Sequence, residues 1–223
     1  DPSLSLLAYK ASLKAYGEPS SSSSFTNPEI VSIWVRVTEH LSSLRLYQDT
    51  VVAGSRALFL LRQTKNALFR DAQFATSSNG VSNGTNNRRS QYQITSDTYY
   101  ESLFMTLQSL TQAHTSLTNY ALARDEGSES LLLAWDMALS VSSSSNSRGS
   151  TNNNQELQVS ILRIIRALKR LGKTFLLQKH YNPALECFLP SLELLRSSTE
   201  METTLDCASV LGSLGFLYLK LQK

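Results

Sequence analysis

The sequence predicts an all-α protein of about eight helices, stacked as antiparallel helix hairpins. The 223 residues include 37 leucines against only 15 valines and isoleucines together, and leucine favours helices whereas the other two favour strands. With 9 glycines and 5 prolines, the chain is also poor in the residues that form tight β-turns. The apolar residues recur with the helical period, in pairs of segments joined by short turns. A single hairpin cannot bury its apolar faces, so successive hairpins are expected to stack.

The helix boundaries follow from capping residues and breakers. The first helix is predicted over 3–17, before Pro19 and a run of serines. Asn27-Pro28-Glu29 is a strong start signal for the second, because Asn caps, Pro fits the first position and Glu complements the helix dipole. Asn182-Pro183 repeats this pattern, and Pro190 is expected to kink the helix that follows. The later helices are predicted over 28–46, 50–74 (capped by Asp49), 96–124, 128–141, 155–179, 183 onwards and 203–223, with turns at 47–49, 125–127 and 180–183.

Three segments rich in serine and asparagine lack a periodic apolar face and are predicted to be disordered inserts: 19–26, 76–95 and 142–154. Residues 1–223 are otherwise predicted to form one helical-repeat domain. Its last helix has no hairpin partner, and its final stretch, 211–221, is largely apolar. The sequence therefore indicates a fragment of a longer solenoid.

A motif near the end of the chain spans two successive helical segments, and its first half then occurs again. The first segment carries a large residue, a Leu-Gly pair and an aromatic residue. The second carries an alanine, an aromatic residue and a small residue. This pattern resembles the tetratricopeptide repeat, a family of right-handed superhelical solenoids that bind other proteins. The matching residues are Leu168, Leu171, Gly172 and Phe175, then Ala184, Phe188 and Ser191, with a restart at Leu211, Leu214, Gly215 and Tyr218.

The resemblance is clearest over 155–223 and irregular elsewhere. The two Leu-Gly pairs lie 43 residues apart, against the 34 of the family, and Arg196 occupies the position of the terminal proline. The earlier hairpins match only loosely, through two candidate triplets on second helices: Leu131, Trp135 and Ala138, and Thr50, Gly54 and Ala57.

The densest charge cluster lies in the sixth predicted helix. It consists of Arg163, Arg166, Lys169, Arg170 and Lys173, four of them at a 3-4-3 spacing that places them along one helix face. The family resemblance places such residues on the concave groove, where cations suit acidic or phosphorylated peptides. The plain alternative is a solvated polar face.

Catalytic and cofactor signatures are weak. The run 167–174 fits a relaxed phosphate-loop pattern, but it continues a helix whose N–H groups are already bonded, and no strand precedes it. His40, His114 and His180 lie on separate elements, which argues against a metal site. Cys187 lies on a packing face, which indicates a small buried residue rather than a nucleophile. The sequence predicts no enzyme activity in this segment, no cofactor and no metal.

These features predict a non-catalytic scaffold or adaptor of the cytoplasm or nucleus, acting within a multi-protein complex and without a membrane span. The alternative is the helical arm of a large enzyme, since the irregular repeats with inserts loosely resemble those of separase-type cell-division proteases. Nucleic-acid binding by a solenoid is a weaker third reading, because the net charge is only +3.

Overall fold

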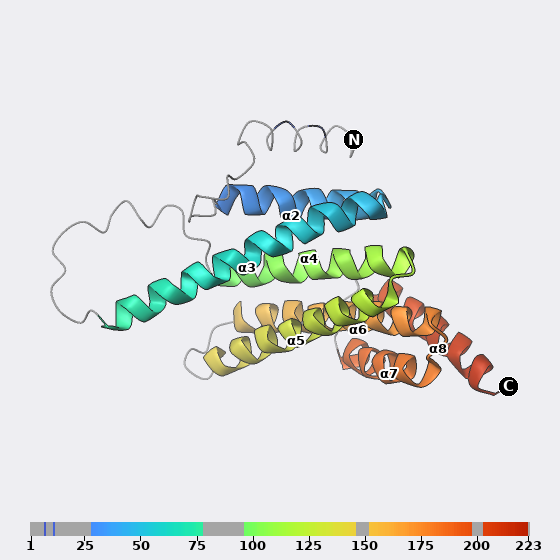
Figure 1. The fold of residues 1–223 in the computed structure, drawn as a ribbon. Coiled ribbons are helices and arrows are strands. Elements are labelled where there is room, and N and C mark those ends of the chain that lie inside the picture. The colour runs from blue at the N-terminus through green and yellow to red at the C-terminus, as the bar shows by residue number, and fades with distance from the viewer. Residues whose placement is uncertain are drawn as a thin grey trace. The chain divides into compact units, whose positions relative to one another are not determined.

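The computed structural model describes residues 28–77, 96–145, 152–197 and 203–222, together with residues 7 and 11. Throughout these segments the chain is helical, with short turns and no strand, which confirms the predicted all-α class (Figure 1). The right-handed superhelix stays a prediction. The helices of the described part are α2 (Pro28–Ser43), α3 (Tyr47–Ser77), α4 (Ser96–Ser116), α5 (Tyr120–Ser145), α6 (Asn152–Leu177), α7 (Tyr181–Ser197) and α8 (Thr203–Leu221).

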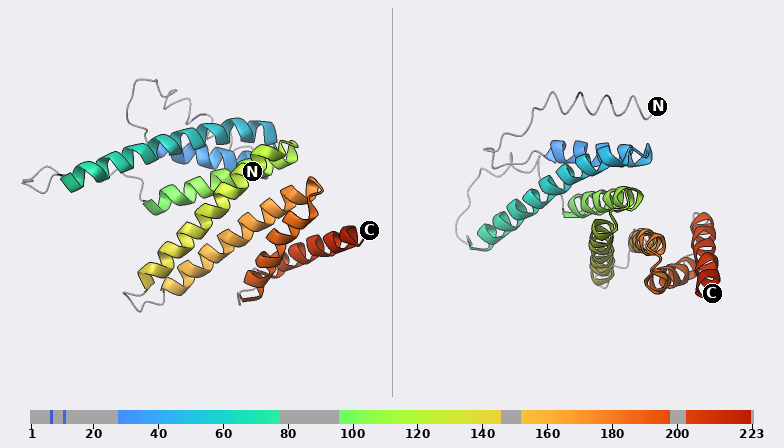
Figure 2. Two further views of the ribbon diagram at one scale, coloured as in Figure 1. Left: turned by 60° about the horizontal axis from the view of Figure 1, so that its bottom comes forward. Right: turned by 45° about the vertical axis from the view of Figure 1, so that its right-hand side comes forward.

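The chain divides into two compact units, 1–109 and 110–223, and the boundary falls inside α4. In the first unit α2 packs against α3. In the second, α5 packs against α6, α6 against α7 and α7 against α8 (Figure 2). The helix α8 also touches α6. Apart from α6 and α8, the helices of each of these pairs follow one another in the chain, as in helix hairpins. The single repeat domain over 1–223 stays a prediction.

Three of the turns share one backbone geometry. Arg45, Thr118 and Lys179 each adopt a left-handed conformation, with φ of 59°, 63° and 63°. In each turn the next amide donates to the carbonyl five residues back, which is the hydrogen bond of a Schellman motif. These bonds run from Leu46 to Leu41 (3.0 Å), from Asn119 to His114 (2.8 Å) and from His180 to Phe175 (2.9 Å).

A common register follows each turn. A tyrosine begins the second helix of every hairpin, at Tyr47, Tyr120 and Tyr181. The third and tenth residues after it are small and fully buried, so the two helices can approach closely at the same points. These residues are Thr50 and Ala57 in α3, Ala123 and Ser130 in α5, and Ala184 and Ser191 in α7.

The predicted boundary between the fourth and fifth helices is wrong. The turn lies at 117–119, not at 125–127, and α5 already includes Gly127. Gly127 lies at a close helix contact rather than in a turn, because a Cβ there would lie 3.1 Å from Leu171 Cδ1 and 3.4 Å from Thr111 Cγ2. The left-handed residue of the turn is Thr118, although glycine or asparagine is the residue usually found in that conformation.

This boundary also moves the repeat register of α5. Counting from the turn, the residues equivalent to Thr50, Gly54 and Ala57 are Ala123, Gly127 and Ser130, not the predicted triplet of Leu131, Trp135 and Ala138. Trp135 is instead exposed.

The third helix begins earlier than predicted. Tyr47 is its first residue, and the Leu46 carbonyl accepts hydrogen bonds from the Thr50 amide (2.9 Å) and hydroxyl (2.8 Å). Asp49 therefore lies inside the first turn, where its charge complements the helix dipole, and is not the cap.

Parts of two predicted inserts are helical. Residues 142–145 end α5 and residues 152–154 begin α6, although 142–154 was predicted to be disordered. The hydroxyls of Ser142 and Ser143 donate to the carbonyls of Leu139 and Ser140, so both are paired within the helix. Residues 76–77 of the predicted insert 76–95 are likewise helical and end α3. The rest of that insert, the predicted insert 19–26 and the predicted helix over 3–17, apart from residues 7 and 11, lie outside the described residues.

Several buried hydroxyls inside the helices are paired in the same way. Thr38 donates to the Trp34 carbonyl, Thr106 to that of Ser102 and Ser191 to that of Phe188. Because such a hydroxyl is satisfied by its own helix, it can lie in a packed interface without the cost of an unpaired polar group. This explains how a chain so rich in serine packs its helices together.

One apolar cluster of the second unit lies between α6, α7 and α8. It is formed by Ile165, Ala184, Phe188, Leu192, Leu195, Val210, Leu214 and Leu217. The core of the first unit includes a smaller cluster between α2 and α3, formed by Val37, Leu41 and Ala53. The larger core fixes α6 and α8 next to each other and so positions the charged residues described below.

Candidate partner-binding surface

Two of the predicted cations on α6 are exposed. Arg166 and Lys173 lie seven residues apart, and therefore at nearly the same angle around the helix axis. Both side chains are free to meet solvent or a bound molecule.

Lys169 is engaged within the fold. Its Nζ pairs with the carboxylate of Asp206 on α8, and both side chains are partly buried. This ion pair joins the two helices. It also neutralises the charge of Lys169, which was predicted to belong to the cluster of five cations.

Arg170 and Arg163 are half-buried. Burial lowers the pKa of Arg170 to about 10, and the nearby charge of Arg166 acts in the same direction. The guanidinium therefore stays charged at neutral pH but lies largely within the packing. The five predicted cations consequently do not form one exposed patch.

The helix α8 also carries an exposed aromatic residue and an exposed cation. Phe216 and Lys220 are both exposed, and Lys220 Nζ lies 5.3 Å from the centroid of the Phe216 ring, within cation–π range. We call Arg166, Lys173, Phe216 and Lys220 the α6–α8 surface, since all four lie on the helices that the Lys169–Asp206 pair joins. Sequence reasoning missed Lys220 because it lies outside the dense charge cluster.

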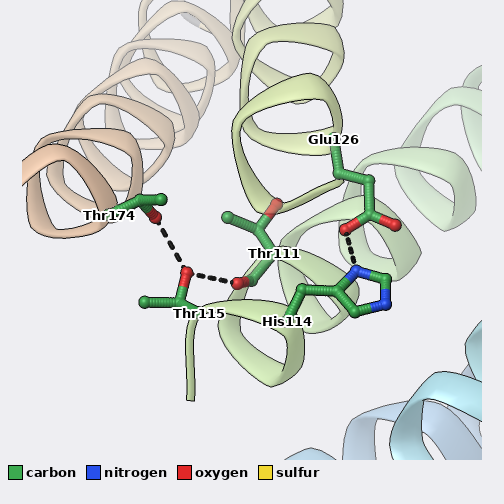
Figure 3. A network of polar contacts seen from close by, with 5 residues as sticks. All are labelled: Thr111, His114, Thr115, Glu126 and Thr174. Carbon is green, nitrogen blue, oxygen red and sulfur yellow. Dashed lines mark hydrogen bonds and ion pairs between the residues drawn. The ribbon is translucent and has the colours of Figure 1, made fainter. Parts of the chain in front are cut away.

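A buried polar network joins α4 to its neighbours (Figure 3). His114 Nδ1 lies 2.8 Å from Glu126 Oε2 on α5. The Thr115 hydroxyl donates to the Thr111 carbonyl at 2.6 Å and lies 2.8 Å from the hydroxyl of Thr174 on α6. Thr174 Oγ1 also lies 3.0 Å from the carbonyl oxygen of Arg170 in its own helix. The network ties three helices together, and the sequence did not indicate it because its partners lie 12 and 59 residues apart.

Glu126→Gln is expected to change how stability depends on pH. Burial raises the pKa of Glu126 above its ordinary value of 4.5, although the hydrogen bond from His114 opposes the shift. A raised carboxyl pKa adds stability below the unfolded value, and this contribution is lost as the pH rises through the folded value. The free energy of unfolding of the wild type, relative to that of the variant, should therefore fall between about pH 4 and about pH 7.

Urea denaturation of both proteins at the two pH values measures this difference. The matched control is Glu193→Gln, at an exposed carboxyl of α7. A difference between wild type and Glu126→Gln that stays constant with pH contradicts the assignment.

The structure also bears on the other candidate sites: the Cys187 thiol, the phosphate-loop pattern, a metal site and a membrane span. Cys187 is buried, and burial, with the charge of Glu186, raises the pKa of its thiol to about 11, so it is protonated at neutral pH. The run 167–174 lies inside α6 and is helical throughout. No three His, Cys, Asp or Glu side chains come together as metal ligands in the described segments. Of the helices in that part of the chain, none is both long and apolar enough to cross a bilayer.

Comparison with known proteins gives no family assignment. No protein-family model matches the chain, and no curated protein is significantly similar to it in sequence.

Proposed function

We propose that this chain is a non-catalytic scaffold of tetratricopeptide-like hairpins that binds an acidic or phosphorylated segment of a partner protein at the α6–α8 surface. The observation that carries the proposal is the pairing of exposed cations with an exposed aromatic ring on adjoining helices. Arg166 and Lys173 supply charge on α6, and Phe216 supplies an apolar anchor on α8.

The repeated register supports the scaffold part of the proposal. Three hairpins share the left-handed turn residue, the tyrosine after it and the two buried small residues. Repetition of one hairpin design is characteristic of solenoids, whose extended surfaces bind other proteins. The departure in spacing between the Leu-Gly pairs makes this an irregular member of such a class.

The chemistry of the surface supports the choice of ligand. An arginine guanidinium binds carboxylates and phosphates through paired charge-assisted hydrogen bonds, and a lysine adds a second point charge. Phe216 offers a face for an apolar or aromatic side chain of the same peptide. The two thiols, Cys187 and Cys207, are free, which suits a reducing compartment, so we place the protein in the cytoplasm or nucleus, within a multi-protein complex.

Selection from a displayed library of random short peptides tests this function. The wild-type chain should enrich peptides that combine Asp, Glu or phosphoserine with an apolar residue. The variant Arg166→Glu/Lys173→Glu should lose these peptides, because both reversed charges repel an acidic ligand. Arg170 is left unchanged, since reversing a half-buried charge would disturb the fold.

The matched control is Arg36→Glu/Arg196→Glu, which changes the net charge equally at exposed positions of α2 and α7. It should retain the selected peptides. Enrichment of basic or purely apolar peptides, or equal losses in both double variants, contradicts the proposal.

A further inference from the structure

The helix α5 carries three large apolar side chains on its exposed side. Leu132 is 67% exposed, Leu139 62% and Trp135 45%. Their spacing of three and then four residues places them on one face of the helix. We call Leu132, Trp135 and Leu139 the α5 stripe. Single exposed apolar residues are ordinary on a protein surface, but three large ones within about two turns form a contiguous patch, which is typical of interaction sites.

The helices before and after α5 in the chain both pack on its other side. The buried residues of α5 are small: Ala123, Gly127, Ser130, Ala134 and Ala138. Ala123 lies nine residues before Leu132, about two and a half turns, and therefore on the opposite side of the helix. A Cβ at Gly127 would lie 3.1 Å from Leu171 Cδ1 of α6 and 3.4 Å from Thr111 Cγ2 of α4. The two neighbouring helices are thus accounted for, and neither covers the stripe.

The equivalent places of α7 hold charged residues. Counted from the tyrosine that begins each helix, Glu193 and Arg196 of α7 correspond to Leu132 and Trp135 of α5. Both residues of α7 are exposed. Packing of a hairpin therefore does not require an apolar residue at these places. The leucine and the tryptophan of α5 need an explanation outside the hairpin.

The charge beside the stripe indicates what covers it. Within 120–143, the exposed charged residues of α5 are Asp125 and Asp136, both acidic. Asp125 lies seven residues before Leu132 and Asp136 four after it, so both follow the same side of the helix as the stripe. These carboxylates disfavour an anionic membrane surface or a nucleic acid, and they add like charges to a two-fold pair of stripes. They favour a ligand that presents cations.

We propose that the α5 stripe is a docking surface for a basic amphipathic helix of a partner protein. The stripe takes the apolar face of that helix, with Trp135 as the largest anchor. Asp125 and Asp136 pair with lysine or arginine at the edge of that face. The proposal goes beyond the proposed function, because the ligand has the opposite charge and the residues lie on another helix than the α6–α8 surface.

Two fluorescently labelled synthetic peptides are the probes. Both are helices of alanine and glutamine with three leucines at the spacing of the stripe. One carries two lysines eleven residues apart at the edge of the leucines, as Asp125 and Asp136 are spaced, and the other carries glutamates there. Anisotropy measures their binding to the full chain. The lysine peptide should bind the wild type in saturable fashion and at least tenfold more tightly than the glutamate peptide. Asp125→Lys/Asp136→Lys should reverse this preference.

Leu132→Glu/Trp135→Arg tests the apolar part of the surface. It introduces the residues that α7 carries at these places, so the fold should be retained, and circular dichroism checks this. Binding of the lysine peptide should weaken at least tenfold. The matched control is Val52→Glu/Phe59→Arg, at exposed apolar positions of α3, which should retain binding. Arg166→Glu/Lys173→Glu should also retain it, which separates failure of this proposal from failure of the proposed function.

Three binding results overturn the proposal. They are the absence of saturable binding of the lysine peptide, equal affinities of the two peptides for the wild type, and binding that Leu132→Glu/Trp135→Arg leaves unchanged.

Two further measurements test the other occupants of the stripe. A concentration-dependent dimer that Leu132→Glu/Trp135→Arg converts to monomer in sedimentation assigns the stripe to a second copy and overturns the proposal. Fluorescence of Trp135 in a Trp34→Phe background should be quenched by iodide in the free chain and protected by the lysine peptide. Protection in the free chain assigns the stripe to another part of the same chain and equally overturns it.

Discussion

Replacing Phe188 with alanine is expected to lower the free energy of unfolding by about 3–5 kcal/mol. The ring is 2% exposed and packs in the core shared by α6, α7 and α8, near Ile165 and Leu214. The substitution removes the buried ring and leaves a cavity that neighbouring helices fill only in part, so both the transfer of the ring and the cavity contribute. Urea denaturation followed by circular dichroism measures the loss.

Phe216→Ala is the matched control. Phe216 has the same side chain on the neighbouring helix but is 47% exposed, so its removal should cost less than about 1 kcal/mol. Equal losses at the two positions would mean that α7 does not carry the core that joins α6 to α8.

Replacing Gly172 with leucine is expected to lower the free energy of unfolding by about 1–3 kcal/mol, the usual cost of overpacking a core. The space beside Gly172 is occupied by Phe188 and Cys187, one through its ring and the other through a Cβ fixed to the backbone. The new side chain forces α6 and α7 apart. This loss outweighs the gain of up to about 1 kcal/mol that any ordinary residue brings when it replaces a helical glycine.

Gly215→Leu is the same glycine-to-leucine replacement at a position where no other atom lies close to the new side chain. Nothing lies within 4 Å of a Cβ there, so only the gain in helix propensity remains and the stability should rise by up to about 1 kcal/mol. Thermal denaturation of the two variants should therefore show shifts of opposite sign. Shifts of the same sign contradict the close approach of α6 and α7 at Gly172.

Standard signals predicted some helix starts but not that of α7, which begins at Tyr181 rather than at Pro183 as its Asn182-Pro183 signal indicated. α2 begins at Pro28 as its Asn-Pro-Glu signal indicates, and α8 begins at Thr203. The turn between α4 and α5 could not be found in this way, because Thr118 adopts the left-handed conformation that glycine usually provides. Gly127, the glycine that suggested a turn, is instead a packing residue.

The candidate surface was predicted in part. The spacing of the cations places them on α6, but it does not tell which of them meet another helix. Asp206, which pairs with Lys169, lies 37 residues further along the chain, and the burial of Arg170 depends on tertiary packing. Phe216 and Lys220 join the surface only because the fold places α8 beside α6. Such long-range neighbours leave no local pattern in one sequence.

The affinity of a selected acidic peptide, compared with that of a single-stranded oligonucleotide at about 50 and about 200 mM salt, tests the central claim most directly. Fluorescence anisotropy gives both dissociation constants for the wild type and for Arg166→Glu/Lys173→Glu. The account predicts that the peptide still binds at the higher salt and that the double variant weakens it at least tenfold, about 1.4 kcal/mol. Tighter binding of the oligonucleotide with a steep salt dependence, or peptide binding that ignores both reversals, would contradict it.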